Sequence, residues 1–111
     1  MVAPEQQARA ALWELDFALQ ELDWLRRGEV REQQLVESVA RQIALGARHV
    51  EAYPLGLLPL PGDLRAQLAD RFSRLADALD DLAPGWRSHE DLTGAHERLR
   101  AGLEQRGVDV D

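Results

Sequence analysis

Three helix-breaking stretches divide the chain into four amphipathic segments, and this division limits the possible folds more than any other sequence feature. The breaks are Gly28, the segment 53–62 with its three prolines, and the dipeptide Pro84-Gly85. Between the breaks, apolar residues recur every three or four positions, which is the spacing of one face of an α-helix. The pattern therefore predicts four helices, over residues 4–27, 31–52, 63–82 and 89–106.

The clearest amphipathic pattern lies in the segment 63–82. Its apolar residues follow a 4-4-3-4-3 spacing: Leu64, Leu68, Phe72, Leu75, Leu79 and Leu82. Asp63 is expected to cap the start of this helix, and Ser88 the start of the helix over 89–106. Gly28 and Gly107 are expected to end the first and last helices in the left-handed conformation that glycine adopts at no steric cost.

Four amphipathic helices separated by two short breaks and one long connection favour an all-α four-helix bundle, in one domain over residues 1–111. Gly94 and Gly102 lower the helix propensity of the last segment. A three-helix core with a loosely docked fourth helix is therefore the alternative. The connection 53–62 is rich in leucine and proline and extends by about 3.1 Å per residue in a polyproline-like form. It could turn between neighbours or cross the bundle, so the topology stays open.

The acidic balance argues against two classes of partner. The formal net charge is −7 at pH 7, and every segment has more acidic than basic residues. Nucleic-acid binding needs a positive footprint, and an acidic membrane surface would repel this chain, so we expect neither partner. The chain lacks cysteine, and residues 1–5 do not resemble a signal peptide. These two features lead us to expect a cytoplasmic protein. All strongly basic residues are arginines, as is common in proteins encoded by GC-rich bacterial genomes, so we also expect a bacterial source.

The helix over residues 4–27 is unusual because it carries two apolar faces. At roughly 100° per residue, its small and aliphatic residues share one face: Ala8, Ala11, Leu12, Leu15, Leu19, Leu22 and Leu25. The aromatic residues Trp13, Phe17 and Trp24 fall on a second face, roughly 180° away. Acidic residues run along both edges of the aromatic face: Glu14, Glu21, Asp16 and Asp23. A helix on the outside of a bundle needs only one apolar face, so the aromatic face requires a cover.

Two interpretations of the aromatic face remain open. The connection 53–62 or the last helix could cover it within one chain. Alternatively, Trp13, Phe17 and Trp24 could anchor a protein partner or a second copy, because Trp and Phe are enriched at interfaces. Leu57 and Leu58 could join such an interface as an extended docking segment. A homodimer is the favoured assembly, since two-fold dimers are the commonest oligomers.

Enzymatic chemistry finds little support in the sequence. No catalytic, cofactor-binding or metal-binding residue is assigned, and no cofactor is expected. The alternative is a metal-dependent all-α nucleotide or phosphate hydrolase that uses the carboxylate pairs Glu29/Glu32 and Asp77/Asp80. Glu29 and Glu32 have the Glu-x-x-Glu spacing of such enzymes but sit at the start of a helix. Asp77 and Asp80 depart from the Glu-x-x-Asp pattern and lie opposite the leucine face.

The three histidines are also weak candidates for chemistry. None has a glutamate three residues before it, which is the metal-binding motif of helical bundles. His96, two turns after His89, is expected at the edge of the core with one hydrogen-bond partner. A small apolar ligand near His49 and Tyr53, one turn apart, is a third possibility. The favoured function is a non-enzymatic interaction module, such as an adaptor, an antitoxin-like or immunity-like inhibitor, or a regulatory subunit.

Overall fold

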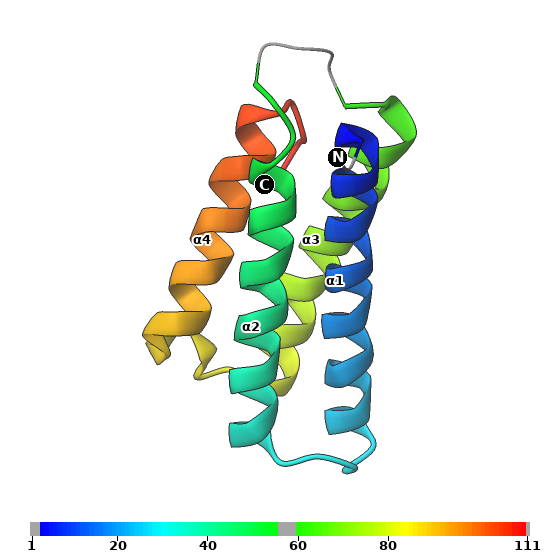
Figure 1. The fold of residues 1–111 in the computed structure, drawn as a ribbon. Helices are drawn as coiled ribbons and strands as arrows, with labels where there is room; N and C mark the ends of the chain where they lie inside the picture. Colours follow the sequence, from blue (N-terminus) through cyan, green and yellow to red (C-terminus); the bar gives the residue numbers. More distant parts are fainter. Residues whose placement is uncertain (1–2, 56–59, 111) are drawn as a thin grey trace.

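The computed structural model describes residues 3–55 and 60–110 and shows an all-α four-helix bundle, as predicted (Figure 1). The helices are α1 (Pro4–Arg26), α2 (Glu32–Glu51), α3 (Gly62–Leu82) and α4 (Glu90–Gln105). A short 3-10 turn, η1 (Trp86–Ser88), precedes α4. The predicted helix ends are correct to within a residue or two, because glycine and proline mark them locally.

The packing order around the bundle is α1, α2, α4, α3. Helix α1 packs against α2 and α3, and α4 packs along α2. Successive helices run in opposite directions, so α2 ends and α3 begins at the same end of the bundle (Figure 1). Because α2 and α3 lie on a diagonal, the long connection joins helices that are not neighbours. The alternative with a loosely docked fourth helix is wrong, since Leu92, Leu99 and Leu103 of α4 are fully buried.

Two glycines end helices as predicted. Gly28 after α1 has φ +75°, and Gly107 after α4 has φ +80°. After α4 the backbone N–H of Val108 donates to the carbonyl of Leu103 at 3.0 Å, and Val108 is buried. This pair of features is the Schellman arrangement, in which an otherwise unpaired helix carbonyl is satisfied and an apolar contact closes the helix end.

The two predicted N-caps are wrong. Helix α3 starts at Gly62 with Pro61 at the N-cap position, so Asp63 lies within the first turn and makes no capping bond. At α4 the N-cap is His89, again without a side-chain bond, and Ser88 belongs to η1. The buried Trp86 explains the second error. The Trp86 side chain lies in the core, so residues 86–88 form the tight turn η1 before α4. The sequence around Trp86 did not indicate this turn.

Two hydrogen bonds fix the register of α1 against the antiparallel α2. His49 Nδ1 lies 2.8 Å from Gln7 Oε1 near one end, and Ser38 Oγ donates to Glu21 Oε1 at 2.8 Å near the other. Between these bonds, buried small residues line α1 and α2: Ala8, Ala11, Ala18, Gly46 and Ala47. Small side chains let two helix backbones approach closely, so the α1–α2 pair forms a well-defined side of the bundle.

No helix in the part of the chain that the structure describes combines the length and the apolar character needed to cross a membrane.

Candidate protein-docking surface on α1

The two predicted faces of α1 differ in burial. Trp13 is 72% exposed and Phe17 is 49% exposed, one turn apart on the outside of the helix. On the opposite face, Ala11, Leu15 and Ala18 are completely buried. No hydrogen bond, ion pair or ring contact within the described residues involves either aromatic side chain. We call Trp13 and Phe17 the aromatic face of α1.

Neither of the intramolecular covers considered from the sequence is observed among the described residues. Helix α4 lies diagonally across the bundle from α1 and packs on α2 instead. Of the connecting segment, Tyr53 is buried whereas Leu55 is 58% exposed. Leu57 and Leu58, the other two residues of the predicted interface, lie outside the described residues.

Trp24 differs from the other two aromatic residues of α1, which corrects the prediction of one continuous aromatic face. It is half-buried at the end of α1 and lines a small hollow of about 160 Å³. Val30 and Leu35 form the apolar part of the wall. The polar part comes from three other residues: Glu21, Gln34 and Ser38.

Glu21 is a functional candidate that the sequence analysis missed. Its side chain is only 9% exposed, and its Oε1 accepts a hydrogen bond from Ser38 Oγ. Its Oε2 is buried without a partner, and no arginine forms an ion pair with it among the described residues. The helical wheel gave no signal, because it places Glu21 beside exposed Phe17. The neighbouring helix α2 buries it.

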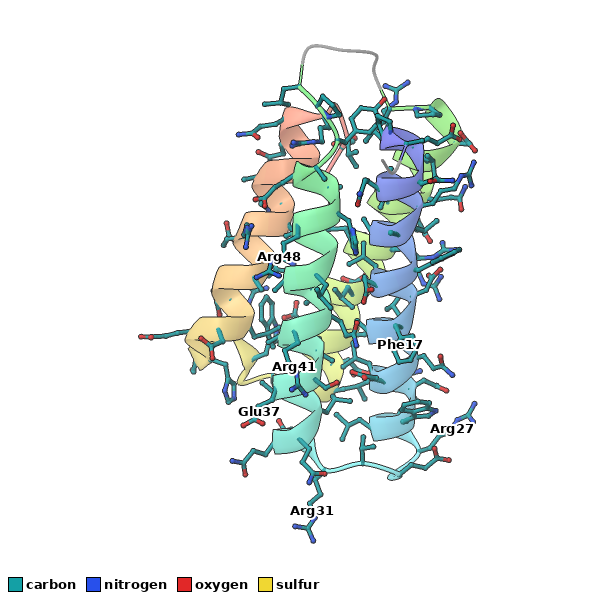
Figure 2. All side chains as sticks on the ribbon, viewed as in Figure 1. Phe17, Arg27, Arg31, Glu37, Arg41 and Arg48 are labelled. Carbon is teal, nitrogen blue, oxygen red and sulfur yellow. The ribbon has the colours of Figure 1, made fainter. Side chains whose placement is uncertain are left out.

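Helix α2, which packs beside α1, also presents exposed residues. Leu45 is 39% exposed. Arg41 and Arg48 are exposed, and neither lies within ion-pair distance of a described carboxylate. Figure 2 shows both guanidinium groups on α2 and Phe17 on α1, all on the side that faces the viewer. This side therefore combines an aromatic ring with two cationic groups.

The predicted carboxylate pairs do not assemble a metal centre. Asp77 and Asp80 are exposed on α3, as predicted, and Glu29 and Glu32 are exposed around the α1–α2 turn. Asp80 instead accepts a hydrogen bond from Trp86 Nε1 at 2.8 Å, and this bond lowers the pKa of the Asp80 carboxyl. Within residues 3–55 and 60–110, no three side chains of the histidine, aspartate or glutamate type gather as metal ligands.

The histidines have separate surroundings. His49 is bonded to Gln7, and His89 is exposed at the start of α4. His96 is 6% exposed; its ring stacks on Phe72 at 4.6 Å between centroids and meets the edge of Trp86 at 5.1 Å. Its Nε2 is buried without a partner, so the expected hydrogen bond at the core edge is not found there. Burial lowers the pKa of His96 and favours the neutral ring.

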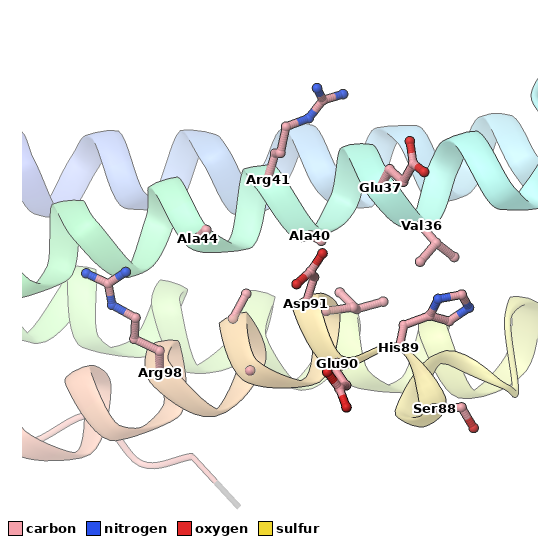
Figure 3. Close-up of a pocket in the computed structure, with 13 residues that line it drawn as sticks. Val36, Glu37, Ala40, Arg41, Ala44, Ser88, His89, Glu90, Asp91 and Arg98 are labelled. Atoms are coloured by element: carbon pink, nitrogen blue, oxygen red, sulfur yellow. The ribbon is translucent and has the colours of Figure 1, made fainter.

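A larger groove, of about 960 Å³, runs between α2 and α4. Its floor is made of small residues such as Ala40 and Ala44, and Asp91 and His89 reach toward α2 from the other wall (Figure 3). Arg98 at one end is already paired with Glu51. The groove carries charges of both signs and no buried, unpartnered polar atom, so it gives no indication of a particular ligand.

Comparisons of this chain with protein-family models, with curated proteins and with solved structures found no match. The candidate function therefore depends on the geometry of the chain itself.

Proposed function

We propose that this protein is a non-enzymatic interaction module that associates with a second copy of itself through the α1–α2 side of the bundle. The observation that carries the proposal is the exposure of Trp13 and Phe17 on a helix whose other face is already buried. Tryptophan anchors are among the side chains that contribute most to binding at protein interfaces. Large exposed apolar groups that adjoin one another mark interaction surfaces more often than random surface positions do.

The register between the two helices favours a second copy as the occupant. The bonds Gln7–His49 and Glu21–Ser38 fix which levels of α1 and α2 correspond. Interpolation between them places Trp13 about level with Leu45, and Phe17 about level with Arg41. A two-fold axis parallel to the helices preserves these levels, so α1 of each copy would face α2 of the other.

The chemistry of the facing groups is complementary in that arrangement. Trp13 would cover Leu45 of the second copy, and Phe17 would receive the guanidinium of Arg41 in a cation–π contact. Arg41 is available for this contact because no described carboxylate pairs with it. In a symmetric dimer each favourable contact occurs twice. Direct α1-to-α1 packing would instead bring the acidic edges of two helices together, which is unfavourable.

The test is the mass in solution of the wild type and of the double variant Trp13→Ala/Phe17→Ala. Light scattering coupled to size exclusion should give a dimer for the wild type. Losing two central anchors, each worth about 2 kcal/mol or more, should weaken the dimer by roughly a thousandfold or more and give a monomer.

A matched control is Leu55→Ala, which removes another exposed apolar side chain, 58% exposed, beyond the end of α2. It should remain dimeric. The charge reversal Arg41→Glu should weaken the dimer without changing the helical circular dichroism. A wild type that is monomeric at every accessible concentration would disprove self-association.

A further inference from the structure

We propose that the hollow formed by Glu21 and Trp24 is a binding site for an aliphatic cation, either a guanidinium or an ammonium group on a short apolar stem. The site lies at the end of α1, below the aromatic face, and is lined by residues of α1, the α1–α2 turn and α2. Its existence does not depend on the proposed dimer. One part of the proposal does rest on the proposed dimer: that the cation is supplied by a side chain of the second copy.

The buried carboxylate is the first observation that supports this site. Glu21 has two oxygens and one hydrogen bond, from Ser38, while its Oε2 is buried without a partner. An ionised carboxylate taken out of water is costly unless it is paired or fully hydrogen-bonded. Buried polar atoms without partners are few in native proteins, and a missing ion or ligand is one of their recognised causes. Within the described residues no arginine fills this role.

The walls of the hollow are the second observation. Trp24 is half-buried there, and Val30 and Leu35 complete an apolar lining. A tryptophan ring attracts a cation over its face, and the effect increases when the cation is desolvated. The hollow measures about 160 Å³, which is room for roughly five water-sized groups. An aliphatic ammonium or guanidinium head with part of its stem fits this volume and this combination of charge and apolar surface.

The sequence separates two sources of such a cation. The chain contains arginine but no lysine, so the basic side chains of a second copy are all guanidinium groups. A free small amine or a lysine of another protein would present an ammonium group. A preference for guanidinium therefore favours a second copy of this chain, and a preference for ammonium favours a separate ligand.

The test uses nuclear magnetic resonance of the three tryptophan indole N–H groups in the full chain, labelled with ¹⁵N. The probes are n-propylguanidinium and n-butylammonium chlorides, with n-butanol as the neutral probe of similar shape and constant ionic strength. At least one of the two cations should shift the Trp24 indole resonance saturably, whereas n-butanol should not. Trp86, which is buried between α3 and α4 with its N–H bonded to Asp80, provides an internal reference that should not follow the same saturation curve.

Glu21→Gln keeps an acceptor for Ser38 and removes the charge, and it should weaken cation binding at least tenfold. Glu14→Gln is the matched control, because Glu14 lies two turns earlier on the same edge of α1 and does not line the hollow. If Glu21→Gln does not fold, Trp24→Leu measured by calorimetry replaces it, with the same expected loss. Absence of saturable binding of either cation, an equal response to n-butanol, or unchanged affinity in the folded variant would overturn the site.

Repeating the titration in Trp13→Ala/Phe17→Ala separates this proposal from the dimer. Saturable binding by a monomeric variant supports the site whether or not the wild type dimerises. If n-propylguanidinium raises the dimer dissociation constant of the wild type, the natural occupant of the hollow is an arginine of the second copy. A dimer that is indifferent to the probe, together with saturable binding, would identify a separate cation.

Discussion

Two pairs of aromatic residues, each a tryptophan and a phenylalanine, occupy opposite environments in this bundle. Trp86 and Phe72 are almost completely buried between α3 and α4, where both contact the ring of His96. Trp13 and Phe17 are exposed on α1 and contact no ring within the described chain. The same residue types therefore serve the core in one place and remain without intramolecular packing in the other.

The difference lies in how completely each tryptophan is satisfied. The indole N–H of Trp86 donates to Asp80, and the guanidinium of Arg87 lies 4.5 Å from the ring centroid. All three kinds of tryptophan interaction, apolar, polar and cation–π, are thus made within one chain. Trp13 makes neither a hydrogen bond nor a cation–π contact within the described residues, and its ring is 72% exposed. An intermolecular contact is the remaining way for Trp13 to gain them, which is why we assign a docking role to Trp13 and not to Trp86.

The largest expected difference between the pairs is in stability. Trp86→Ala should lower the free energy of unfolding by about 3–5 kcal/mol, because it empties a buried site next to two other rings. Trp13→Ala should change it by no more than about 0.5 kcal/mol when the chain is monomeric. Urea denaturation at a protein concentration at which the chain is monomeric measures both.

Equal losses of unfolding free energy in Trp86→Ala and Trp13→Ala would contradict the difference proposed between the two tryptophans. A loss of several kcal/mol in Trp13→Ala would mean that its ring packs within the monomer. Phe17→Ala and Phe72→Ala form a second matched pair with the same expected order, since Phe72 is 2% exposed and Phe17 is 49% exposed.

The buried pair also predicts a pH dependence through His96. Burial lowers the pKa of His96 in the folded state below the ordinary value near 6.5 of the unfolded chain. Nearby Glu97 and Asp80 act against this effect, and Arg100 and Arg87 add to it. Between the two pKa values the unfolded chain binds more protons, so stability is full above about pH 6.5. It falls as the pH drops toward the folded pKa, by at most about 1.4 kcal/mol per pH unit.

Denaturation between about pH 7.5 and 5.5 measures this slope, in a range where ordinary carboxyls stay ionised. His96→Phe keeps a ring against Phe72 and Trp86 and should flatten the slope. As a control, His89→Gln replaces an exposed histidine at the start of the same helix and should leave the slope of stability against pH unchanged. An unchanged slope in His96→Phe would show that another group causes the pH dependence.

Local signals predicted most of the fold, and tertiary packing determined the parts that were missed. The periodic leucines and the stops at Gly28 and Gly107 depend on neighbours in sequence, so the four helices were predictable. Trp86 belongs to no periodic segment, and only the position of α3 relative to α4 buries it. The order of the helices was open because a connection of ten residues can reach either a neighbour or a diagonal helix.

The candidate site divides in the same way. The aromatic face was predictable, since a helical wheel needs only the sequence of α1. The burial of Glu21 and Trp24 was not, because α2 and the turn before it supply the covering residues. A helical wheel shows which side chains share a face of one helix, but it cannot show which of them a neighbouring helix buries.

The smallest expected effect concerns the polar contact that distinguishes the two tryptophans. Asp80→Ala should lower the free energy of unfolding by about 1 kcal/mol, because the buried indole N–H of Trp86 loses its acceptor. Asp80→Asn retains an amide oxygen that can accept the bond and should cost less. The decisive measurement is a double-mutant cycle with Trp86→Phe, which removes the donor. In that background Asp80→Ala should cost almost nothing, since only the exposed guanidinium of Arg87 then pairs with the carboxylate. An equal cost in both backgrounds would place the value of Asp80 in its pairing with Arg87, and the polar difference between Trp86 and Trp13 would then not affect stability.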